Sequence, residues 1–468
     1  MQKNEILIGI VQALGVEGEG IIKLDDFVVF VPFALPGETI KYKVLKVQKN
    51  IVFAKLVEVL EKSSDRIEPL CKYFGKCGGC QLQHLKYDKQ LAFKSKKVEE
   101  CFYKIAGLSI SVDETVTGDD CYYYRNNLQL PVVNVKGKNQ IGFYAKNSHN
   151  VVEIDDCVIN PRWTKTIILI FNEYFSANGI LGYDEEKHLG DVREITVKES
   201  SNKLLITVVT LKDSLKNYND LINRLKNALD LEFSLYININ SKRTNVIYGD
   251  SFRLLYGKPI IESQMHGINY KVGVRSFMQV NDSVCYKLYD TVIKTICADD
   301  KTTVIDSYSG AGLMTAMLSR SANKAIGIEI IPEAVRLANE LASDNGLENK
   351  ITNYLGKCEE ILPDIIAKEK EINKNVSLVI DPPRKGCDKK VIDAILHSKI
   401  DKIVYVSCNP STLARDVGLL MGSLKEVDGK IVKSNYSDYR YKINFIKTFD
   451  IFCQTKHIET LIFLERSC

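Results

Sequence analysis

From about residue 256 onward, the chain alternates between short apolar stretches and longer stretches with the spacing of amphipathic helices. The apolar stretches are rich in β-branched residues, as buried strands are, and they include residues 303–306, 324–329, 376–381 and 402–407. Strands and helices that alternate in this way form a parallel sheet covered by helices on both faces. We therefore predict a Rossmann-like, doubly wound α/β domain over residues 256–468. The carboxyl ends of its strands share one edge, which is where such sheets bind their ligands.

The first part of the chain is long enough for two further domains. Residues 1–60 contain five short strand candidates separated by glycine and Pro-Gly turns, which predicts a small β-barrel. Residues 61–255 mix strand and helix patterns, which predicts a central α/β domain. Within it, residues 85–106 have the apolar spacing of a helix, and a glycine follows them.

Composition limits the class of protein. The formal net charge is +4, which permits an RNA partner without indicating one. The N-terminus lacks the apolar core of a signal peptide, and no apolar run reaches the roughly 18 residues that span a membrane. We therefore expect a cytoplasmic protein without a membrane span. In that reducing compartment, the 13 cysteines are expected to bind metal or act in catalysis rather than form disulfides.

Three of the cysteines are close together in the sequence. Cys71, Cys77 and Cys80 lie within ten residues, and the two glycines before Cys80 allow the backbone to fold tightly. Cys157 is the best candidate for a fourth ligand, and four thiolates suit either a [4Fe–4S] cluster or structural zinc. Zinc sites usually combine two close pairs of ligands, whereas three close cysteines with a distant fourth are commoner around iron–sulfur clusters. The spacing therefore favours the cluster, with zinc or no metal as the alternatives.

Two of the predicted strands end in residues that suit an adenosyl ligand. The first leads into a glycine-rich turn, which lets the chain pass close to a ligand at a helix N-terminus. The next strand ends at Glu329, whose carboxylate suits ribose hydroxyls. The turn has the pattern Asp-x-Tyr-x-Gly-x-Gly, which lacks the dinucleotide spacing and better suits an adenosyl group without pyrophosphate. Asp381, followed by two prolines, can accept a further hydrogen bond; ordinary turns are the alternative at both places.

Cys408 follows the fourth of these strands, and Glu459 precedes the last apolar stretch. Alone, such a cysteine is most often a small buried side chain, and such a glutamate is most often a solvated charge. Together with a methyl donor they meet the needs of uracil carbon-5 methylation. A thiolate adds to carbon-6 and makes carbon-5 nucleophilic, and a carboxylate later removes the carbon-5 proton so that the thiolate can leave. We predict Cys408 as the nucleophile and Glu459 as the base. The cation beside the thiolate is expected among Arg384, Lys385 and His457.

Over nearly its whole length the chain resembles the RNA uracil-5-methyltransferase family, and the motifs occur in family order. They are Cys71-x5-Cys77-x2-Cys80 with Cys157, Phe277-x-Gln279, Asp306-Ser307-Tyr308, Ile328-Glu329, Asp381-Pro382-Pro383-Arg384, Ser407-Cys408-Asn409-Pro410 and His457-Ile458-Glu459. The first sixty residues resemble a TRAM domain, an OB-like RNA-binding barrel. The motifs that carry this second resemblance are Gly18-Glu19-Gly20 and the turn Phe33–Glu38.

The resemblance implies specific roles for these residues. It implies Cys408 as nucleophile and Glu459 as base, and S-adenosylmethionine and a [4Fe–4S] cluster as cofactors. The S-adenosylmethionine ligands would be Gln279, Tyr308, Glu329 and Asp381, and the cluster ligands would be Cys71, Cys77, Cys80 and Cys157. Within the family, the chain resembles most the bacterial enzymes that modify 23S rRNA. The resemblance also implies that the helix over 85–106 packs on the C-terminal domain, so that the central domain is discontinuous. We expect a monomer without an obligate protein partner.

Four other functions compete with this interpretation. A tRNA substrate within the same family is the nearest alternative. Cytosine-5 methyltransferases place their cysteine in Pro-Cys or Thr-Cys motifs, whereas Asn-Pro follows Cys408 here. Radical methylthiotransferases need cysteine spacings of three and two, whereas this chain has five and two. A non-catalytic RNA-binding protein would have lost Cys408 or Glu459, and both residues are present.

Overall fold

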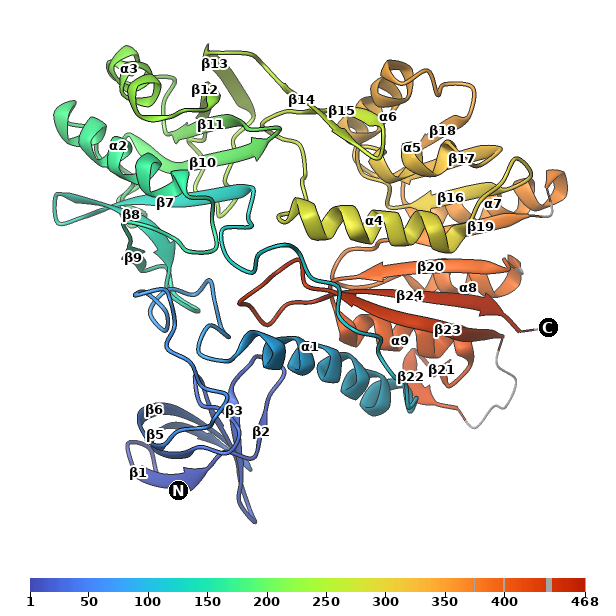
Figure 1. Cartoon of the computed structure of the whole chain (residues 1–468), viewed down its shortest axis with the longest axis horizontal. Coiled ribbons are helices and arrows are strands. Elements are labelled where there is room, and N and C mark those ends of the chain that lie inside the picture. The colour runs from blue at the N-terminus through green and yellow to red at the C-terminus, as the bar shows by residue number, and fades with distance from the viewer. Residues whose placement is uncertain (374, 399, 435–439, 468) are drawn as a thin grey trace.

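The computed structural model describes residues 1–373, 375–398, 400–434 and 440–467. Its first part is a six-stranded sheet in the order β1-β5-β6-β4-β3-β2 (Figure 1). Along β5 every second side chain from Ile40 to Val44 is buried, as expected for a strand with one face on a core. The predicted unit is all-β, but a two-residue strand, β2, makes six strands rather than five. The strands are β1 (Ile6–Ile10), β2 (Ala13–Leu14), β3 (Gly20–Lys23), β4 (Val28–Val31), β5 (Thr39–Gln48) and β6 (Ile51–Glu61).

The central part of the chain forms a seven-stranded sheet in the order β13-β12-β11-β10-β7-β8-β9. Leu128, Leu130 and Val132 of β7 face a core that they share with helices α2 and α3. The alternate residues Asn127 and Gln129 therefore lie on the opposite face of the sheet. The elements are β7 (Asn127–Val135), β8 (Lys138–Tyr144), β9 (Val151–Glu153), α2 (Trp163–Ala177), β10 (Val192–Ser200), β11 (Lys203–Thr210), α3 (Tyr218–Ala228), β12 (Glu232–Ile239) and β13 (Ser251–Tyr256).

The C-terminal sheet has seven strands in the order β18-β17-β16-β19-β20-β24-β23. The first five are parallel, as predicted, but β24 and β23 run antiparallel to their neighbours. The strands are β16 (Thr303–Ser307), β17 (Lys324–Glu329), β18 (Ile351–Leu355), β19 (Val376–Ile380), β20 (Lys402–Ser407), β23 (Tyr441–Phe449) and β24 (Glu459–Arg466). The helices are α4 (Asp282–Ile296), α5 (Leu313–Ser319), α6 (Pro332–Asp344), α7 (Cys358–Ile372), α8 (Lys389–Ser398) and α9 (Pro410–Met421).

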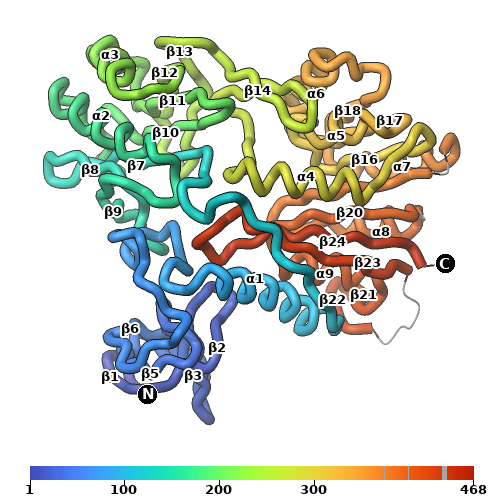
Figure 2. Tube along the Cα trace, viewed as in Figure 1, coloured from blue at the N-terminus to red at the C-terminus, as the bar shows by residue number. Residues whose placement is uncertain are grey.

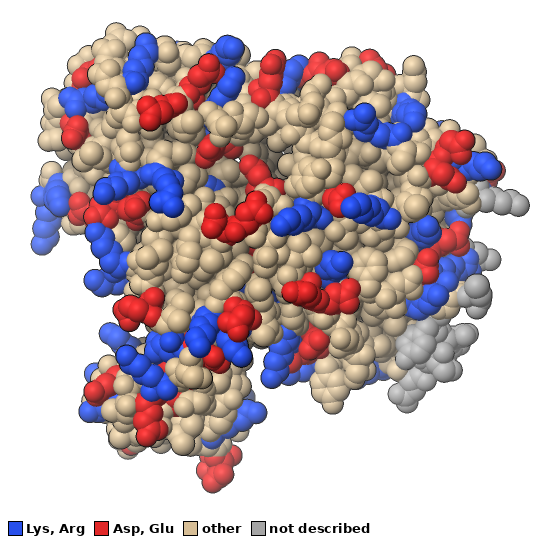
Figure 3. Space-filling model, in the orientation of Figure 1, with Lys and Arg blue, Asp and Glu red and all other residues tan. Residues whose placement is uncertain are grey.

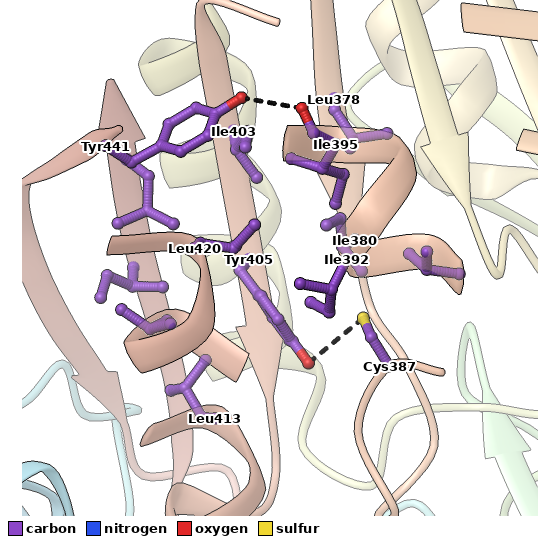
Figure 4. Close-up of a cluster of buried hydrophobic side chains, with 14 of the residues drawn as sticks. Leu378, Ile380, Cys387, Ile392, Ile395, Ile403, Tyr405, Leu413, Leu420 and Tyr441 are labelled. Carbon is purple, nitrogen blue, oxygen red and sulfur yellow. Dashed lines mark hydrogen bonds between the residues drawn. The ribbon is translucent and has the colours of Figure 1, made fainter. Parts of the chain in front are cut away.

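Two cores cover the two faces of this sheet. On one face, Leu378, Ile380 and Tyr405 pack against α7, α8 and α9, and Figure 4 shows part of this core. The Tyr405 hydroxyl lies inside the core and donates a hydrogen bond of 2.6 Å to Asp416. On the other face, Val404 and its neighbours pack against α4 and α5. Two hairpins, β14–β15 (Ile261–Met265, Ile268–Val272) and β21–β22 (Leu424–Val427, Lys430–Lys433), lie outside the main sheets.

Helix α1 (Tyr87–Cys101) continues as a π-helical turn, η1 (Phe102–Ala106), and ends at Gly107 in the left-handed conformation. Although it precedes the central sheet in the chain, it packs against α9 of the C-terminal part, and Val98 and Phe102 belong to that core. Figures 1 and 2 show α1 beside the loop that leads into β24. No helix in the described part of the chain is long and apolar enough to cross a membrane.

A fully buried ion pair fastens α1 to this loop. The Lys94 ammonium donates to Asp450 Oδ1 at 2.5 Å, and both side chains have no exposed surface. We expect Lys94→Met to lower the free energy of unfolding by about 3–5 kcal/mol, because Asp450 would stay buried without its partner. Lys104→Met, which breaks the exposed pair with Glu100, should cost less than about 1 kcal/mol. Urea denaturation followed by circular dichroism measures both, and equal effects would contradict this account of the buried pair.

Candidate active site and cysteine cavity

The end of β20 and the start of β24 bring Cys408 and Glu459 to one edge of the C-terminal sheet. Ser407, the last residue of β20, pairs with Thr460 of β24. Cys408 directly follows β20, and Glu459 is the first residue of β24. The two residues are therefore close together because β20 and β24 pair in antiparallel register. Arg384, in the loop after β19, lies beside both side chains. Asp381 from the same loop adds a second carboxylate to the group.

Burial and neighbouring charges shift the protonation of Cys408 and Glu459. Burial, and then the charge of Glu459, raises the pKa of the Cys408 thiol above its ordinary value, whereas Arg384 lowers it. Burial and the charge of Asp381 raise the pKa of Glu459 well above its usual range, and Arg384 again opposes the shift. Burial of its carboxyl raises the pKa of Asp381 to about 7, although the residue as a whole is exposed. Arg384 is therefore the cation that favours the charged form of both Cys408 and Glu459.

The other predicted cation, His457, does not supply a charge. Burial lowers the pKa of its imidazole to about 4, and the neighbouring charges of Lys456 and Arg384 act in the same direction. At neutral pH the ring is uncharged. Glu459 Oε1 is buried without a hydrogen-bond partner among the described residues, so one carboxylate oxygen remains available to accept a proton.

The neighbouring strands β16 and β17 end where the sequence predicts an adenosyl ligand. Glu329 accepts hydrogen bonds of 2.9 Å from the backbone N–H groups of Gly310 and Ile331. Tyr308 has φ of +65°, a conformation that a residue with a side chain adopts only when its surroundings impose it, and such strain gathers at functional sites. Asp306 lies below the turn, where the Thr315 hydroxyl donates to it at 2.6 Å. Burial raises the pKa of Asp306 to about 7.

Gln279 lies on the segment that leads into α4, at the junction with the central sheet. Its backbone carbonyl accepts a hydrogen bond of 2.8 Å from the buried Asn126, which also donates to Asp282 at 2.6 Å. The side chain of Gln279 is half-buried and takes part in none of the hydrogen bonds of the described residues. Cys285, in the first turns of α4, is close enough to Asp381 and Glu459 for their charges to act on its thiol, so α4 begins near these two carboxylates.

Sequence reasoning missed two residues that support this segment. Asn126 is one, and Lys198 of β10 is the other: its buried ammonium donates to the carbonyls of Val274 and Ser276 at 2.7 and 2.5 Å. Burial lowers the pKa of Lys198 to about 8. Asn126 directly precedes β7, and Lys198 lies between Val197 and Glu199 near the end of β10. Neither position stands out from its neighbours in the sequence.

The loop between β23 and β24, which leads into Glu459, is held by hydrogen bonds from two other segments. Its Gln454 carbonyl accepts hydrogen bonds from the N–H groups of Gln81 and Leu82 at 3.2 and 3.1 Å. The side chain of Gln81 in turn accepts from the N–H of Lys456 at 3.3 Å. Gln90 of α1 donates to the Gln454 side chain at 3.0 Å. The cysteine-containing segment and α1 therefore both hold the loop that leads into the predicted base.

The four predicted cluster cysteines line one cavity of about 600 Å³ beside the central sheet. Burial raises the pKa of Cys77 to about 11 and that of Cys80 to about 12, and the other thiols add to both shifts. Two sulfurs accept hydrogen bonds: Cys157 from the Asn160 amide at 3.1 Å, and Cys77 from a backbone N–H at 3.3 Å. Within the described residues, however, no three or more Cys, His, Asp or Glu side chains stand close enough together to hold a metal ion. The cluster therefore stays a prediction.

Comparison with known proteins assigns the chain to a family. A model of the tRNA (uracil-5-)-methyltransferase family matches residues 86–467, and a model of the TRAM domain matches residues 10–57. The chain belongs to the tRNA (uracil-5-)-methyltransferase family. This confirms the predicted family, the predicted N-terminal TRAM domain and the predicted activity of an S-adenosylmethionine-dependent RNA methyltransferase.

Relatives of similar length support the same assignment. A protein of Clostridium acetobutylicum described as an uncharacterized RNA methyltransferase is 38% identical, over 100% of this chain and 98% of its own length. A protein of Halalkalibacterium halodurans with the same description is 36% identical, over 99% of this chain and 98% of its own. The crystal structure of Pyrococcus abyssi tRNA (uracil-54, C5)-methyltransferase with S-adenosyl-L-homocysteine has a TM-score of 0.76 and 24% identity. It covers 98% of this chain and 100% of that one, which shows that this member of the methyltransferase family has the same fold.

Proposed function

We propose that this enzyme methylates carbon-5 of a uridine in 23S rRNA in the cytoplasm. The observation that carries the proposal is the meeting of Cys408, Glu459 and Arg384 at the adjoining ends of β20 and β24. This group brings together a nucleophile, a base and a cation at one edge of the sheet. Support for rRNA rather than tRNA comes from the combination of the TRAM domain with the four cysteines, as in the ribosomal enzymes that the sequence resembles.

The proposed reaction begins at the sulfur of Cys408. Its thiolate adds to carbon-6 of uracil, and the electron pair of the 5,6 double bond becomes available at carbon-5. Carbon-5 attacks the sulfonium methyl group that bound S-adenosylmethionine would supply, and S-adenosylhomocysteine leaves with the electron pair of the broken sulfur–methyl bond. Glu459 then removes the proton left on carbon-5, the double bond forms again and the thiolate leaves carbon-6. The target base must first leave its stack, at a cost of a few kcal/mol, which is lowest in a loop or bulge.

The residues at the ends of β16, β17 and β19 fit the methyl donor. We propose that Gln279, Tyr308, Glu329 and Asp381 bind S-adenosylmethionine. Glu329 suits the ribose hydroxyls because its carboxylate is already oriented by two backbone N–H groups. Gly310 has φ of +55° and nothing within 4 Å of the position that a β-carbon would occupy, which leaves open space above the turn.

The opposing actions of Arg384 and burial predict a pH dependence. Both Cys408 and Glu459 must lose a proton to act, and Arg384 lowers both pKa values. The rate of methyl transfer should therefore rise with pH, and Arg384→Met should move this rise to higher pH. Initial rates of labelled-methyl transfer between about pH 6 and pH 9.5 measure the shift. A profile that keeps its position in Arg384→Met would contradict the assigned role of Arg384.

We further propose that Cys71, Cys77, Cys80 and Cys157 hold a [4Fe–4S] cluster. Four thiols face one cavity, and N–H groups point at two of the sulfurs, an arrangement that suits a cluster whose sulfurs accept hydrogen bonds. Anaerobically purified protein should be brown, with about four iron and four sulfide per chain. Cys157→Ser should lose most of both. Colourless protein with one zinc ion per chain would replace the cluster with a structural zinc site.

The choice of RNA can be tested separately. In a strain that lacks the gene, nuclease digestion and mass spectrometry of purified 23S rRNA should show at least one 5-methyluridine missing, which returns when the gene is restored. The tRNA of the same strain should be unchanged. Loss from tRNA alone would favour the tRNA alternative and would leave the chemistry intact.

A further inference from the structure

The central sheet has an unusually polar face for a sheet in the middle of a molecule. Across the pair β7–β10, Gln129 lies opposite Thr196, and Glu194 lies opposite Pro131. These residues alternate with the leucines and isoleucines that pack on α2 and α3, so they point away from that core. The face lines the part of the 600 Å³ cavity that lies beyond the cysteines.

Three side chains in this cavity have unused hydrogen-bonding groups. No hydrogen bond or ion pair found among the described residues engages the carboxyl of Glu194, the amide of Gln129 or the guanidinium of Arg125. All three line the cavity. Polar groups held in a cavity without partners are costly unless a ligand or water satisfies them. Burial raises the pKa of Glu194 to about 7, and the charge of Arg193, which lines the same cavity, opposes this shift.

An aromatic side chain, Tyr144, lies next to Glu194. Tyr144, at the end of β8, lines the same cavity and is 47% exposed. Burial and then the charge of Glu194 raise the pKa of the Tyr144 hydroxyl, which places the two side chains close together. An exposed aromatic ring beside amide and carboxylate groups is the combination that binds unstacked bases of single-stranded RNA.

One segment links the cavity to a residue proposed to bind S-adenosylmethionine. Arg125 lines the cavity, and the next residue, Asn126, holds the backbone of Gln279. RNA bound at both places would run along this segment. Lys, Arg, Asp and Glu side chains are interspersed over the face of the molecule shown in Figure 3. Affinity there would come from specific contacts as well as from charge.

On the basis of the proposed RNA substrate, we propose that this cavity binds an unpaired nucleotide near the target uridine. The base of that neighbouring nucleotide carries an exocyclic amino group. The Glu194 carboxylate accepts a hydrogen bond from that amino group, the Gln129 amide pairs with the adjacent ring edge and Tyr144 stacks on the base. Cytosine, adenine and guanine offer an amino group, whereas uracil presents a carbonyl oxygen that the carboxylate repels. The enzyme thus selects uracil at Cys408 and a base with an amino group in the cavity. These two requirements together fix the register of the RNA.

Binding of short RNA tests this proposal without turnover. Fluorescence anisotropy would measure the Kd of labelled r(UC)6 and rU12 at pH 8, where Glu194 is ionised; both RNAs offer a uridine to the methyl-transfer site, and only the first offers an amino group beside it. All proteins would carry Cys408→Ala, which prevents covalent addition. We expect r(UC)6 to bind roughly fivefold to tenfold more tightly than rU12. Adding Glu194→Ala should bring the ratio of the two Kd values to about one, whereas Glu232→Ala, an exposed carboxylate on the same sheet, should leave it unchanged.

Two further variants keep the test decisive if Glu194→Ala does not fold. Gln129 is exposed, so Gln129→Ala should fold, and it should reduce the ratio at least about twofold. Tyr144→Ala should weaken both RNAs by several-fold and leave the ratio intact. A ratio near one in the parent protein, or one that survives both Glu194→Ala and Gln129→Ala, overturns the proposal. Methylation of rRNA is measured separately, so a failure of the cavity and a failure of the proposed reaction give different results.

Discussion

Replacement of Cys408 by alanine is expected to reduce methyl transfer by at least about four orders of magnitude, because without the sulfur carbon-5 of uracil is not nucleophilic enough to react. Binding of S-adenosylmethionine should stay within about threefold of the parent, since the proposed ligands of the methyl donor lie on other strand ends. Transfer of a labelled methyl group to RNA measures the first effect, and isothermal titration calorimetry measures the second.

A second cysteine provides the control for this experiment. Cys297 lies in the same part of the chain, just after α4, and is exposed. Cys297→Ala should keep nearly full activity. Turnover by Cys408→Ala above a few per cent of the parent rate would remove Cys408 from the role of nucleophile. Loss of activity in both variants would point instead to general damage by cysteine replacement.

Glu459→Gln should stop the reaction after the methyl group has been transferred. Glutamine has the shape of glutamate but cannot take the carbon-5 proton, so the thiolate cannot leave carbon-6. With RNA and S-adenosylmethionine present, the variant should accumulate a covalent protein–RNA adduct that runs as a slower band in a denaturing gel. The multiple-turnover rate should fall by at least about a thousandfold.

The double variant Cys408→Ala/Glu459→Gln separates the two roles. It should form no adduct, because the bond to RNA runs through the sulfur. An adduct in the double variant would mean that another nucleophile attacks the base. Absence of the adduct in Glu459→Gln, with S-adenosylmethionine still bound, would assign the proton removal to a different group, and Asp381 is the nearest candidate.

Much of the C-terminal fold could be predicted because local pattern and global topology agree there. The four strands at residues 303–306, 324–329, 376–381 and 402–407 are short stretches with apolar centres, and the structure has strands at all four. The antiparallel β23 was missed, because its alternating burial leaves polar residues between the apolar ones. Yet the reversal of β24 is what brings Glu459 to the end of β20. Strand direction depends on the connections between strands, which single-sequence periodicity does not report.

The candidate site also contains residues that the sequence predicts and residues that only the folded structure reveals. Motif spacing pointed to Cys408, Glu459 and Asp381, and the structure places these three side chains around Arg384. Sequence reasoning left the choice of cation open among three residues, since the pKa of His457 depends on burial that only the folded chain reveals. It also missed Asn126 and Lys198, whose partners are backbone carbonyls in a distant segment. Such contacts leave no pattern in the residues that receive them.

The buried pair of Lys94 with Asp450 joins residues 356 positions apart in the chain. During synthesis on the ribosome, α1 therefore emerges long before the segment with Asp450, to which Lys94 binds. A nascent protein can fold its TRAM domain, its central sheet and most of its parallel strands while it still lacks the carboxylate needed to finish a turnover. The candidate site is therefore complete only after β24 has been made and has paired with β20, so early release of the chain leaves Cys408 without the base that ends a turnover.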